Sequence, residues 1–178
     1  MFTEPELHRM KILVIDDDRL SVNLLEQLLQ RHGYSRVMGI TNSRAALETC
    51  AAFDPDLILL DLIMPELDGF AILEALRSDA SERFLPIVVL TGDTTEETKS
   101  RALEAGATDF LVKPVSQAEA LLRIRNLLET RRLNVVLRNQ RAALEDAVRE
   151  RTAELHDTIA ELQAANAWLQ PAADLSKG

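Results

Sequence analysis

Polar residues follow four short apolar runs of this chain, and their side chains could together transfer a phosphoryl group. They are the three aspartates at positions 16–18, Asp61, Thr91 and Lys113. Clustered carboxylates repel one another unless a cation lies among them. Mg²⁺ prefers oxygen ligands and also contacts phosphate oxygens. Beside such an ion, Asp61 could attack an electrophilic phosphorus and form an aspartyl phosphate, while Lys113 and Thr91 donate to the phosphoryl oxygens.

The segments between these residues predict strands and helices in alternation. Five apolar runs are predicted as buried strands, namely 11–15, 35–40, 57–60, 87–90 and 109–112. Helical spacing or capping residues predict helices at 19–32, 43–52, 69–77, 95–105 and from Ser116 onward. This alternation predicts an α/β fold with a doubly wound, five-stranded parallel sheet. Ligands of such folds bind beyond the carboxyl ends of the strands, where the four polar positions should converge.

Each of these polar residues also has an ordinary structural interpretation. An aspartate after a strand is usually a turn or helix-capping residue, and a lone threonine or lysine carries little information. Phe110 could simply be a core aromatic. The functional interpretation depends on finding all four positions in order at successive strand ends.

Four longer runs resemble the signature blocks of response-regulator receiver domains, which have a flavodoxin-like fold. The runs are ILVIDDD (Ile12–Asp18), LILLDLIMPELDGF (Leu57–Phe70), IVVLTGD (Ile87–Asp93) and GATDFLVKP (Gly106–Pro114). The resemblance spans about residues 10 to 128, and its motifs are specific in combination.

The resemblance implies a role for each residue of the predicted site. Asp61 is the expected phosphoacceptor, and Lys113 is expected to bond the phosphoryl group. Asp16, Asp17, Asp61 and the backbone carbonyl of Ile63 are the expected Mg²⁺ ligands. The expected donor is a sensor histidine kinase or a phosphotransfer protein. A receiver of this kind is not an enzyme in the usual sense, because it catalyses only its own phosphorylation and dephosphorylation.

The resemblance also implies a conformational switch. Thr91 and Phe110 are the expected switch pair, and a cis peptide bond is expected between Lys113 and Pro114. After phosphorylation Thr91 would move inward, Phe110 would follow, and the surface near the last helix would change shape.

The last helix extends far beyond a compact receiver domain. Residues 117–170 contain no glycine or proline, and a continuous helix of this length would measure about 80 Å. Its distal part therefore needs a partner helix. A seam with heptad-like steps comprises Leu127, Leu137, Leu144, Val148, Leu155, Leu162 and Leu169. The seam is interrupted by polar residues, namely Thr130, Asn134, Arg141, Arg151 and Thr158. Polar residues in a seam fix the register of a coiled coil, and we expect a parallel two-stranded coiled coil.

The stretch Leu137–Leu155 resembles helical linkers that join receivers to output domains of the HD-GYP or similar type. We expect an N-terminal tail at 1–10, a receiver at 11–128, a helical extension at 129–170 and a disordered tail at 171–178. The extension would form a homodimer and relay the signal to an output protein or to an output domain missing from this sequence.

Composition restricts the other functions. The formal net charge of −9 argues against a nucleic-acid partner, which would need a basic face. No apolar stretch is long enough for a membrane span and no signal sequence is evident, so we expect a cytoplasmic protein. Cys50 lies in an apolar run and is expected to be buried.

Two other functions fit parts of the sequence. The chain could be a dimerisation scaffold that acts without phosphorylation. It could also be an aspartate-nucleophile phosphatase of the haloacid dehalogenase type, although Leu20 then stands where that family has a threonine and the block around Asp61 is left unexplained.

Overall fold

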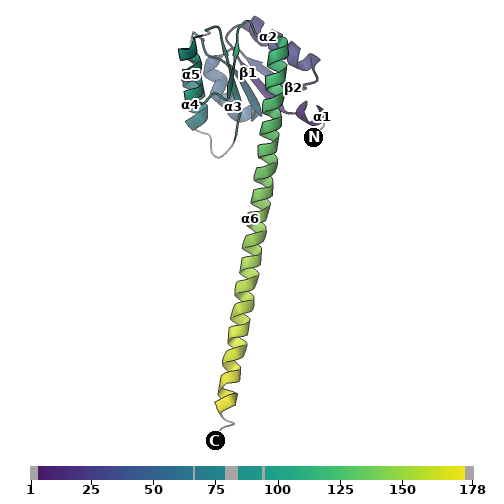
Figure 1. Cartoon of the computed structure of the whole chain (residues 1–178), viewed down its shortest axis with the longest axis vertical. Coiled ribbons are helices and arrows are strands. Elements are labelled where there is room, and N and C mark those ends of the chain that lie inside the picture. The colour runs from purple at the N-terminus through teal and green to yellow at the C-terminus, as the bar shows by residue number, and fades with distance from the viewer. Residues whose placement is uncertain (1–3, 66, 79–83, 94, 175–178) are drawn as a thin grey trace. The chain divides into compact units, whose positions relative to one another are not determined.

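The computed structural model describes the backbone of residues 4–65, 67–78, 84–93 and 95–174 (Figure 1). Side chains are described within these ranges except at 4–5 and 168–174. The chain divides into one compact unit that reaches Asn134 and a second unit from Val135 onward.

The first unit contains a five-stranded parallel sheet with the strand order β2-β1-β3-β4-β5. The strands are β1 (Lys11–Ile15), β2 (Arg36–Ile40), β3 (Leu57–Asp61), β4 (Ile87–Thr91) and β5 (Asp109–Val112). The helices are α1 (Glu4–Leu7), α2 (Arg19–Arg31), α3 (Ala46–Phe53), α4 (Gly69–Ser78), α5 (Glu96–Glu104) and α6 (Gln117–Asp174), with a 3₁₀ turn at Ser43–Ala45. The predicted doubly wound fold is confirmed.

Alternating strand residues fill two separate cores, one on each face of the sheet. Successive side chains of a strand point to opposite faces, so Ile12 and Val14 enter one core while Leu13 and Ile15 enter the other. Residues of α2 and the first turns of α6 complete the first core, and residues of α3, α4 and α5 complete the second. Both faces are covered, which is why the strands read as continuous apolar runs.

The segment predicted as an N-terminal tail belongs to the packed unit. Leu7 is only 3% exposed and joins the first core. The carbonyl oxygen of His8 accepts hydrogen bonds from the backbone N–H of Ser35 at 2.9 Å and from its hydroxyl at 3.1 Å. In its described residues the segment predicted as an N-terminal tail is therefore fixed by an apolar side chain and by backbone hydrogen bonds.

The helix predicted at 43–52, for which Ser43 was the expected cap, begins differently in the structure. Asn42, not Ser43, caps it, since the Asn42 side chain accepts a hydrogen bond from the backbone N–H of Arg44 at 3.0 Å. Ser43 is itself buried. A 3₁₀ turn then precedes α3, so the α-helix begins at Ala46.

The last helix continues slightly further than predicted. The helix α6 has 58 residues and ends at Asp174, so it includes Pro171, where we expected a disordered tail to begin. Proline supplies a helical φ, and this one removes a single backbone donor close to the helix end. The helix thus includes residues 171–174 of the predicted tail, and the remainder of that tail lies outside the described residues.

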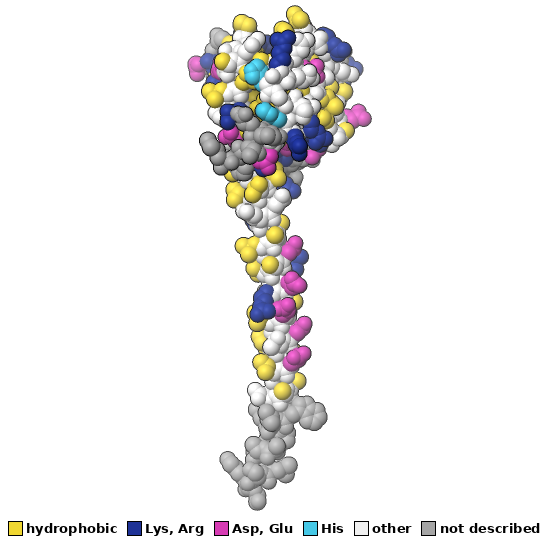
Figure 2. All heavy atoms as spheres, turned by 90° about the vertical axis from the view of Figure 1, so that its right-hand side faces the viewer, with side chains coloured by type: hydrophobic (Ala, Val, Ile, Leu, Met, Phe, Trp, Pro, Cys, Tyr) yellow, Lys and Arg dark blue, Asp and Glu magenta, His cyan; other side chains and the backbone are white. Residues whose placement is uncertain are grey.

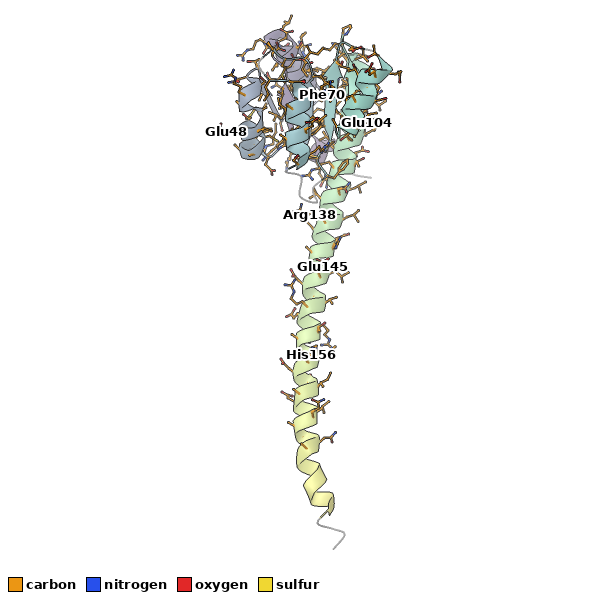
Figure 3. All side chains as sticks on the ribbon, turned by 90° about the vertical axis from the view of Figure 1, so that its left-hand side faces the viewer. Glu48, Phe70, Glu104, Arg138, Glu145 and His156 are labelled. Carbon is orange, nitrogen blue, oxygen red and sulfur yellow. The ribbon has the colours of Figure 1, made fainter. Side chains whose placement is uncertain are left out.

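Beyond Asn134, α6 carries an apolar stripe along one side. Figure 2 shows hydrophobic side chains following one side of this helix and acidic side chains another. The stripe comprises Leu137, Leu144, Val148, Leu155, Ile159 and Leu162, which are between 50% and 66% exposed. Arg138, Glu145 and His156, each one residue after a member of this stripe, are labelled on α6 in Figure 3. The side chain of Leu169, predicted to extend the seam, lies outside the described residues.

Hydropathy places no membrane span in the described part of the chain. None of its helices combines the length and apolar character that crossing a bilayer requires.

Candidate functional site

The predicted site residues converge at the carboxyl ends of the parallel strands. Asp61 and Thr91 are the last residues of β3 and β4, and Asp16 and Lys113 directly follow β1 and β5. Three of them are almost fully buried, with Asp16 at 0%, Thr91 at 1% and Asp61 at 4% exposure. The strand order places β1 beside β3 and β3 beside β4, so neighbouring strands deliver these side chains to one edge.

Lys113 lies between the two buried carboxylates. Its Nζ is 2.7 Å from Asp16 Oδ2 and 3.1 Å from Asp61 Oδ2. Burial raises the pKa of Asp61, the Lys113 charge acts in the opposite direction, and the Asp16 charge adds to the increase. Burial by itself lowers the pKa of Lys113, but the hydrogen bond to Asp16 and the Asp61 charge outweigh it, so the net shift is upward. The arrangement favours a cationic amine beside Asp61.

Three carboxylates at this edge have the chemistry of a divalent-cation site. Oxygen atoms of Asp16, Asp17 and Asp61 lie within 4.8 Å of one another. Asp17 is exposed whereas the other two are buried, so the cluster opens toward solvent on one side. Carboxylate oxygens with access to water suit Mg²⁺, which retains several waters when proteins bind it. The residues present therefore fit this ion.

Ile63 lies beside Asp61, the predicted phosphoacceptor. Its backbone N–H donates to Asp61 Oδ1 at 3.4 Å, and its side chain is 68% exposed. The metal-ligand role of its carbonyl remains a prediction.

Asp18 has a structural role instead of a place in the carboxylate cluster. Its oxygens accept hydrogen bonds from the backbone N–H groups of Leu20 and Ser21 and from the Ser21 hydroxyl, at 3.0, 3.2 and 2.8 Å. The Ser21 hydroxyl and the Leu20 N–H hold the pKa of Asp18 below its usual value. Asp18 is therefore the N-cap of α2. The serine three residues later was the available signal for this role.

The predicted switch residues lie on neighbouring strands. Thr91 Oγ1 accepts a hydrogen bond from the backbone N–H of Asp93 at 3.0 Å. Phe110 on β5 pairs with Val89, two residues before Thr91 on β4. The half-buried Phe110 ring has Lys99 Nζ 5.4 Å from its centroid. The expected cis peptide bond between Lys113 and Pro114 is present.

Gly69 fixes the loop after Asp61, a role that the sequence analysis did not assign. Its backbone N–H donates to the Leu62 carbonyl at 3.1 Å. A Cβ at this position would collide with the backbone carbonyl of Asp61 and lie 2.7 Å from Leu62 Cα. The glycine in the LDGF run was the available signal, because close backbone approach is a common reason for glycine.

Comparisons with known proteins agree with this geometry. The family model described as "Response regulator receiver domain" matches residues 12–125. A probable cyclic di-GMP phosphodiesterase of Vibrio cholerae is 31% identical over 84% of this chain and 34% of its own length. Response regulator PleD of Caulobacter vibrioides is 35% identical over 75% of this chain and 29% of its own length. The chain thus spans about a third of the length of these relatives.

The solved structures include chemotaxis protein CheY4 of Vibrio cholerae, with a TM-score of 0.62 and 31% identity. That similarity covers 67% of this chain and 98% of the CheY4 chain, so it concerns the unit built around the sheet. The family match extends over more than half of the chain and includes every residue of the candidate site. The chain therefore belongs to the response regulator receiver domain family.

Proposed function

We propose that Asp61 accepts a phosphoryl group from the phosphohistidine of a sensor histidine kinase or phosphotransfer protein. The observation that carries this proposal is the placement of Asp61 Oδ2 3.1 Å from the Lys113 amine, at the carboxyl end of β3, where Asp61 is only 4% exposed. Burying a carboxylate beside one amine and two further carboxylates destabilises the folded protein. Such arrangements are typical of functional sites.

The reaction needs little covalent chemistry from the protein. An Asp61 carboxylate oxygen attacks phosphorus, the bond from phosphorus to the donor nitrogen breaks, and the imidazole leaves with the electron pair and takes up a proton. Lys113 and the Thr91 hydroxyl donate to the phosphoryl oxygens and neutralise the charge that Asp61 acquires. Hydrolysis of the acyl phosphate later returns Asp61 and inorganic phosphate. These are the only reactions that we assign to this chain.

Receiver domains bind Mg²⁺ through acidic residues, and we assign this function here to Asp16, Asp17, Asp61 and the Ile63 carbonyl. When bound, the ion would supply positive charge that offsets the negative charge of these carboxylates and of the phosphoryl group. The protein residues orient Asp61, keep its backbone fixed through Gly69, and hold the amine of Lys113 in place.

The phosphoryl group would act through Thr91 and Phe110. Its new charge attracts the Thr91 hydroxyl, which would give up its hydrogen bond with Asp93, and Phe110 moves into the space released. A local charge that biases a two-state element is a general form of protein switch.

The output would pass through a homodimer formed by α6. The apolar stripe of α6 is exposed in a single chain, and a second copy in parallel would cover it as a coiled coil. Relatives such as the probable cyclic di-GMP phosphodiesterase are longer than this chain, and an output protein or domain would receive the signal from the dimer.

Phosphorylation is tested by incubating the chain with acetyl phosphate and Mg²⁺ and recording its intact mass. We expect a single phosphoryl adduct on the wild type and none on Asp61→Asn or in excess EDTA. A wild type that stays unmodified while another receiver is labelled under the same conditions would contradict the proposal. The remaining function would then be a dimerisation scaffold that acts without phosphorylation.

A further inference from the structure

The ring of Phe110 has a cationic side chain from each of two helices beside it. Lys99 Nζ lies 5.4 Å and Arg123 Cζ lies 6.0 Å from the ring centroid. Lys99 belongs to α5 and Arg123 to α6, which pack on opposite faces of the sheet. Phe110 is on β5, an edge strand, so helices on both faces can reach its ring. Cations within about 6 Å of a ring centroid are attracted to the face of the ring.

The amine of Lys99 keeps its charge available for this contact. It also donates to Glu96 Oε1 at 3.0 Å, but the Glu96 side chain is 89% exposed, so water screens this ion pair. The Lys99 side chain is only 21% exposed, and cation–π contacts strengthen as water is excluded from the cation. Lys99 therefore attracts the Phe110 ring from the side of α5.

Arg123 holds the backbone of Phe110 as well as its ring. Its Nη1 donates to both carboxylate oxygens of Asp109, at 2.5 and 2.6 Å. The same Asp109 Oδ1 accepts a hydrogen bond from the backbone N–H of Phe110 at 2.8 Å. Arg123 Nε and Nη2 donate to Glu119 Oε1, one turn earlier in α6, at 3.0 and 2.8 Å. These contacts connect the first turns of α6 to the switch residue.

Both cations favour the position that Phe110 has in this structure. The proposed switch moves the ring inward, into the space that Thr91 releases, and so takes it away from Lys99 and Arg123. An interaction made in only one of two states shifts the equilibrium toward that state. The two cations therefore oppose the switch.

We propose that Lys99 and Arg123 are positioning residues that hold Phe110 in its outer position and so limit the response of the chain to a phosphoryl group on Asp61. The inference rests on the proposed function, because it assigns a restraint on the switch that Asp61 operates. A cation–π contact at a partly exposed site changes such an equilibrium by about two- to fivefold. Loss of either cation should therefore make switching easier by a factor of this size.

The test titrates the full chain with beryllofluoride, a tetrahedral analogue of the phosphoryl group, in excess Mg²⁺. Lys99→Gln should bind the analogue about threefold more tightly than the wild type, because more of the free protein is then in the switched state. Arg123→Gln should act in the same direction. The sign is diagnostic, since the loss of a positive charge by itself would weaken the binding of an anion.

Two further variants separate the ring contact from general effects of charge. Lys99→Arg keeps a cation beside Phe110 and should restore the Kd of the wild type. Arg36→Gln removes a positive charge from β2, an exposed position at the other edge of the sheet, and should not tighten binding.

The lysine signals in NMR spectra of the ¹³C-lysine-labelled chain report the ring position directly. The chain contains only four lysines. The ring current of Phe110 should shift the ε-methylene protons of Lys99 upfield in the free protein, and binding of the analogue should remove this shift as the ring moves away. Lys99→Gln assigns the signal by its absence. Lys11 Nζ lies 5.6 Å from the ring centroid of Phe53, so its signal is an internal reference that should stay unchanged.

Tighter binding in Lys99→Gln and Arg123→Gln, together with loss of the upfield Lys99 signal on binding, is the expected result. Equal Kd values in the wild type and Lys99→Gln, tighter binding in Arg36→Gln, or a Lys99 signal that does not move would overturn the inference while leaving phosphorylation of Asp61 intact. A wild type that does not bind the analogue would overturn the proposed function and this inference with it. Dispersed amide signals verify that each variant is folded, and Lys99→Gln retains the test if Arg123→Gln unfolds.

Discussion

Asp61 and Asp16 are buried next to each other, and among the described residues the amine of Lys113 is paired with both carboxylates. Lys113 reaches both, at 3.1 and 2.7 Å. Removing either carboxyl group relieves part of the repulsion, whereas removing the amine leaves two buried carboxylates unpaired. Sites that bind and transform ligands commonly keep such unfavourable charge arrangements.

Replacing Asp61 with Asn should stabilise the metal-free protein in a pH-dependent way. Burial raises the pKa of Asp61, so the folded state keeps this proton to a higher pH than the unfolded state, whose aspartate titrates near about 3.9. The wild type therefore loses stability as the pH rises from that value through the raised folded pKa. We expect Asp61→Asn to be more stable by about 1 kcal/mol above this window, with the difference vanishing below it.

This expectation is measured by urea unfolding of both proteins in EDTA over a series of pH values. Asp157→Asn, a carboxylate on the exposed surface of α6, serves as the control and should show no such trend. A wild type that is as stable as Asp61→Asn at every pH would mean that the Lys113 charge fully offsets the burial of Asp61.

Mg²⁺ should stabilise the wild type through the same carboxylates. A ligand present at one hundred times its Kd adds about 2.7 kcal/mol to the free energy of unfolding. Asp17→Asn should lose most of this gain, because Asp17 belongs to the carboxylate cluster. Asp18→Asn should keep it, because both Asp18 oxygens already cap α2.

The two neighbouring substitutions form a matched pair for thermal unfolding with and without MgCl₂. An equal response to Mg²⁺ in Asp17→Asn and the wild type would exclude Asp17 as a ligand. Loss of the response in Asp18→Asn would mean that the cap and the cation site are not independent.

At the level of secondary-structure elements, the strands and the site residues at their ends could be predicted because their signals are local. Each strand is a continuous apolar run, and parallel pairing then brings Asp16, Asp61 and Thr91 to one edge whatever the details of the connections. The positions of these residues after successive strands therefore predict most of the site.

Other features depend on contacts between distant segments and could not be read from local patterns. Leu7 is buried only because the core built by other elements receives it, and nothing in the polar segment around it predicts this. Asn42 and Ser43 are both good capping residues, and backbone geometry decides between them. Asp18 shows the same difficulty, since one of three adjacent aspartates caps a helix and its neighbours do not.

Gly69 begins α4 and lies against the backbone of Asp61. Its substitution should therefore affect both the stability of the fold and the site. In Gly69→Ala the added methyl group would collide with the Asp61 carbonyl, so β3 and α4 must move apart. We expect a loss of about 2 kcal/mol or more in the free energy of unfolding and a lower rate of phosphorylation by acetyl phosphate.

Gly92→Ala is the matched control for this prediction, because a Cβ at Gly92 would meet no atom within 4 Å. Denaturant unfolding of both variants distinguishes close approach from the general effect of replacing glycine. A Gly69→Ala protein as stable as Gly92→Ala would show that the loop rearranges without cost.

At the scale of the whole chain, α6 determines which assembly is expected. The stripe beyond Asn134 is apolar and exposed, while ion pairs such as Arg141 to Glu145, at 2.8 Å, lie along the helix. An isolated helix of this length has too few contacts to be stable alone. The sequence could predict the helix and the stripe, but the coiled coil remains a prediction until a second copy is observed.

Leu155→Glu should dissociate the proposed dimer. Leu155 is 52% exposed in the stripe of a single chain, and a buried glutamate there would replace apolar contacts with two repelling charges. The loss of one buried leucine per helix costs about 3 kcal/mol, which corresponds to more than about a hundredfold weaker dimer.

Ala153→Glu adds the same charge on the opposite side of α6 and should leave the dimer intact. Sedimentation equilibrium of the three proteins at equal concentration measures the outcome. A monomeric wild type, or a dimer that persists in Leu155→Glu, would contradict dimerisation through the stripe.

The chemical identity of the phosphorylated residue is the decisive observation for the function of this chain. After incubation with acetyl phosphate and Mg²⁺, borohydride reduces an aspartyl phosphate to homoserine, which peptide mass spectrometry can locate. We predict homoserine at position 61 and at no other aspartate, with none formed in EDTA. Homoserine at Asp16 or Asp17 with Asp61 unmodified, or no homoserine at all in a folded and Mg²⁺-loaded protein, would contradict the assignment of Asp61 as the phosphoacceptor.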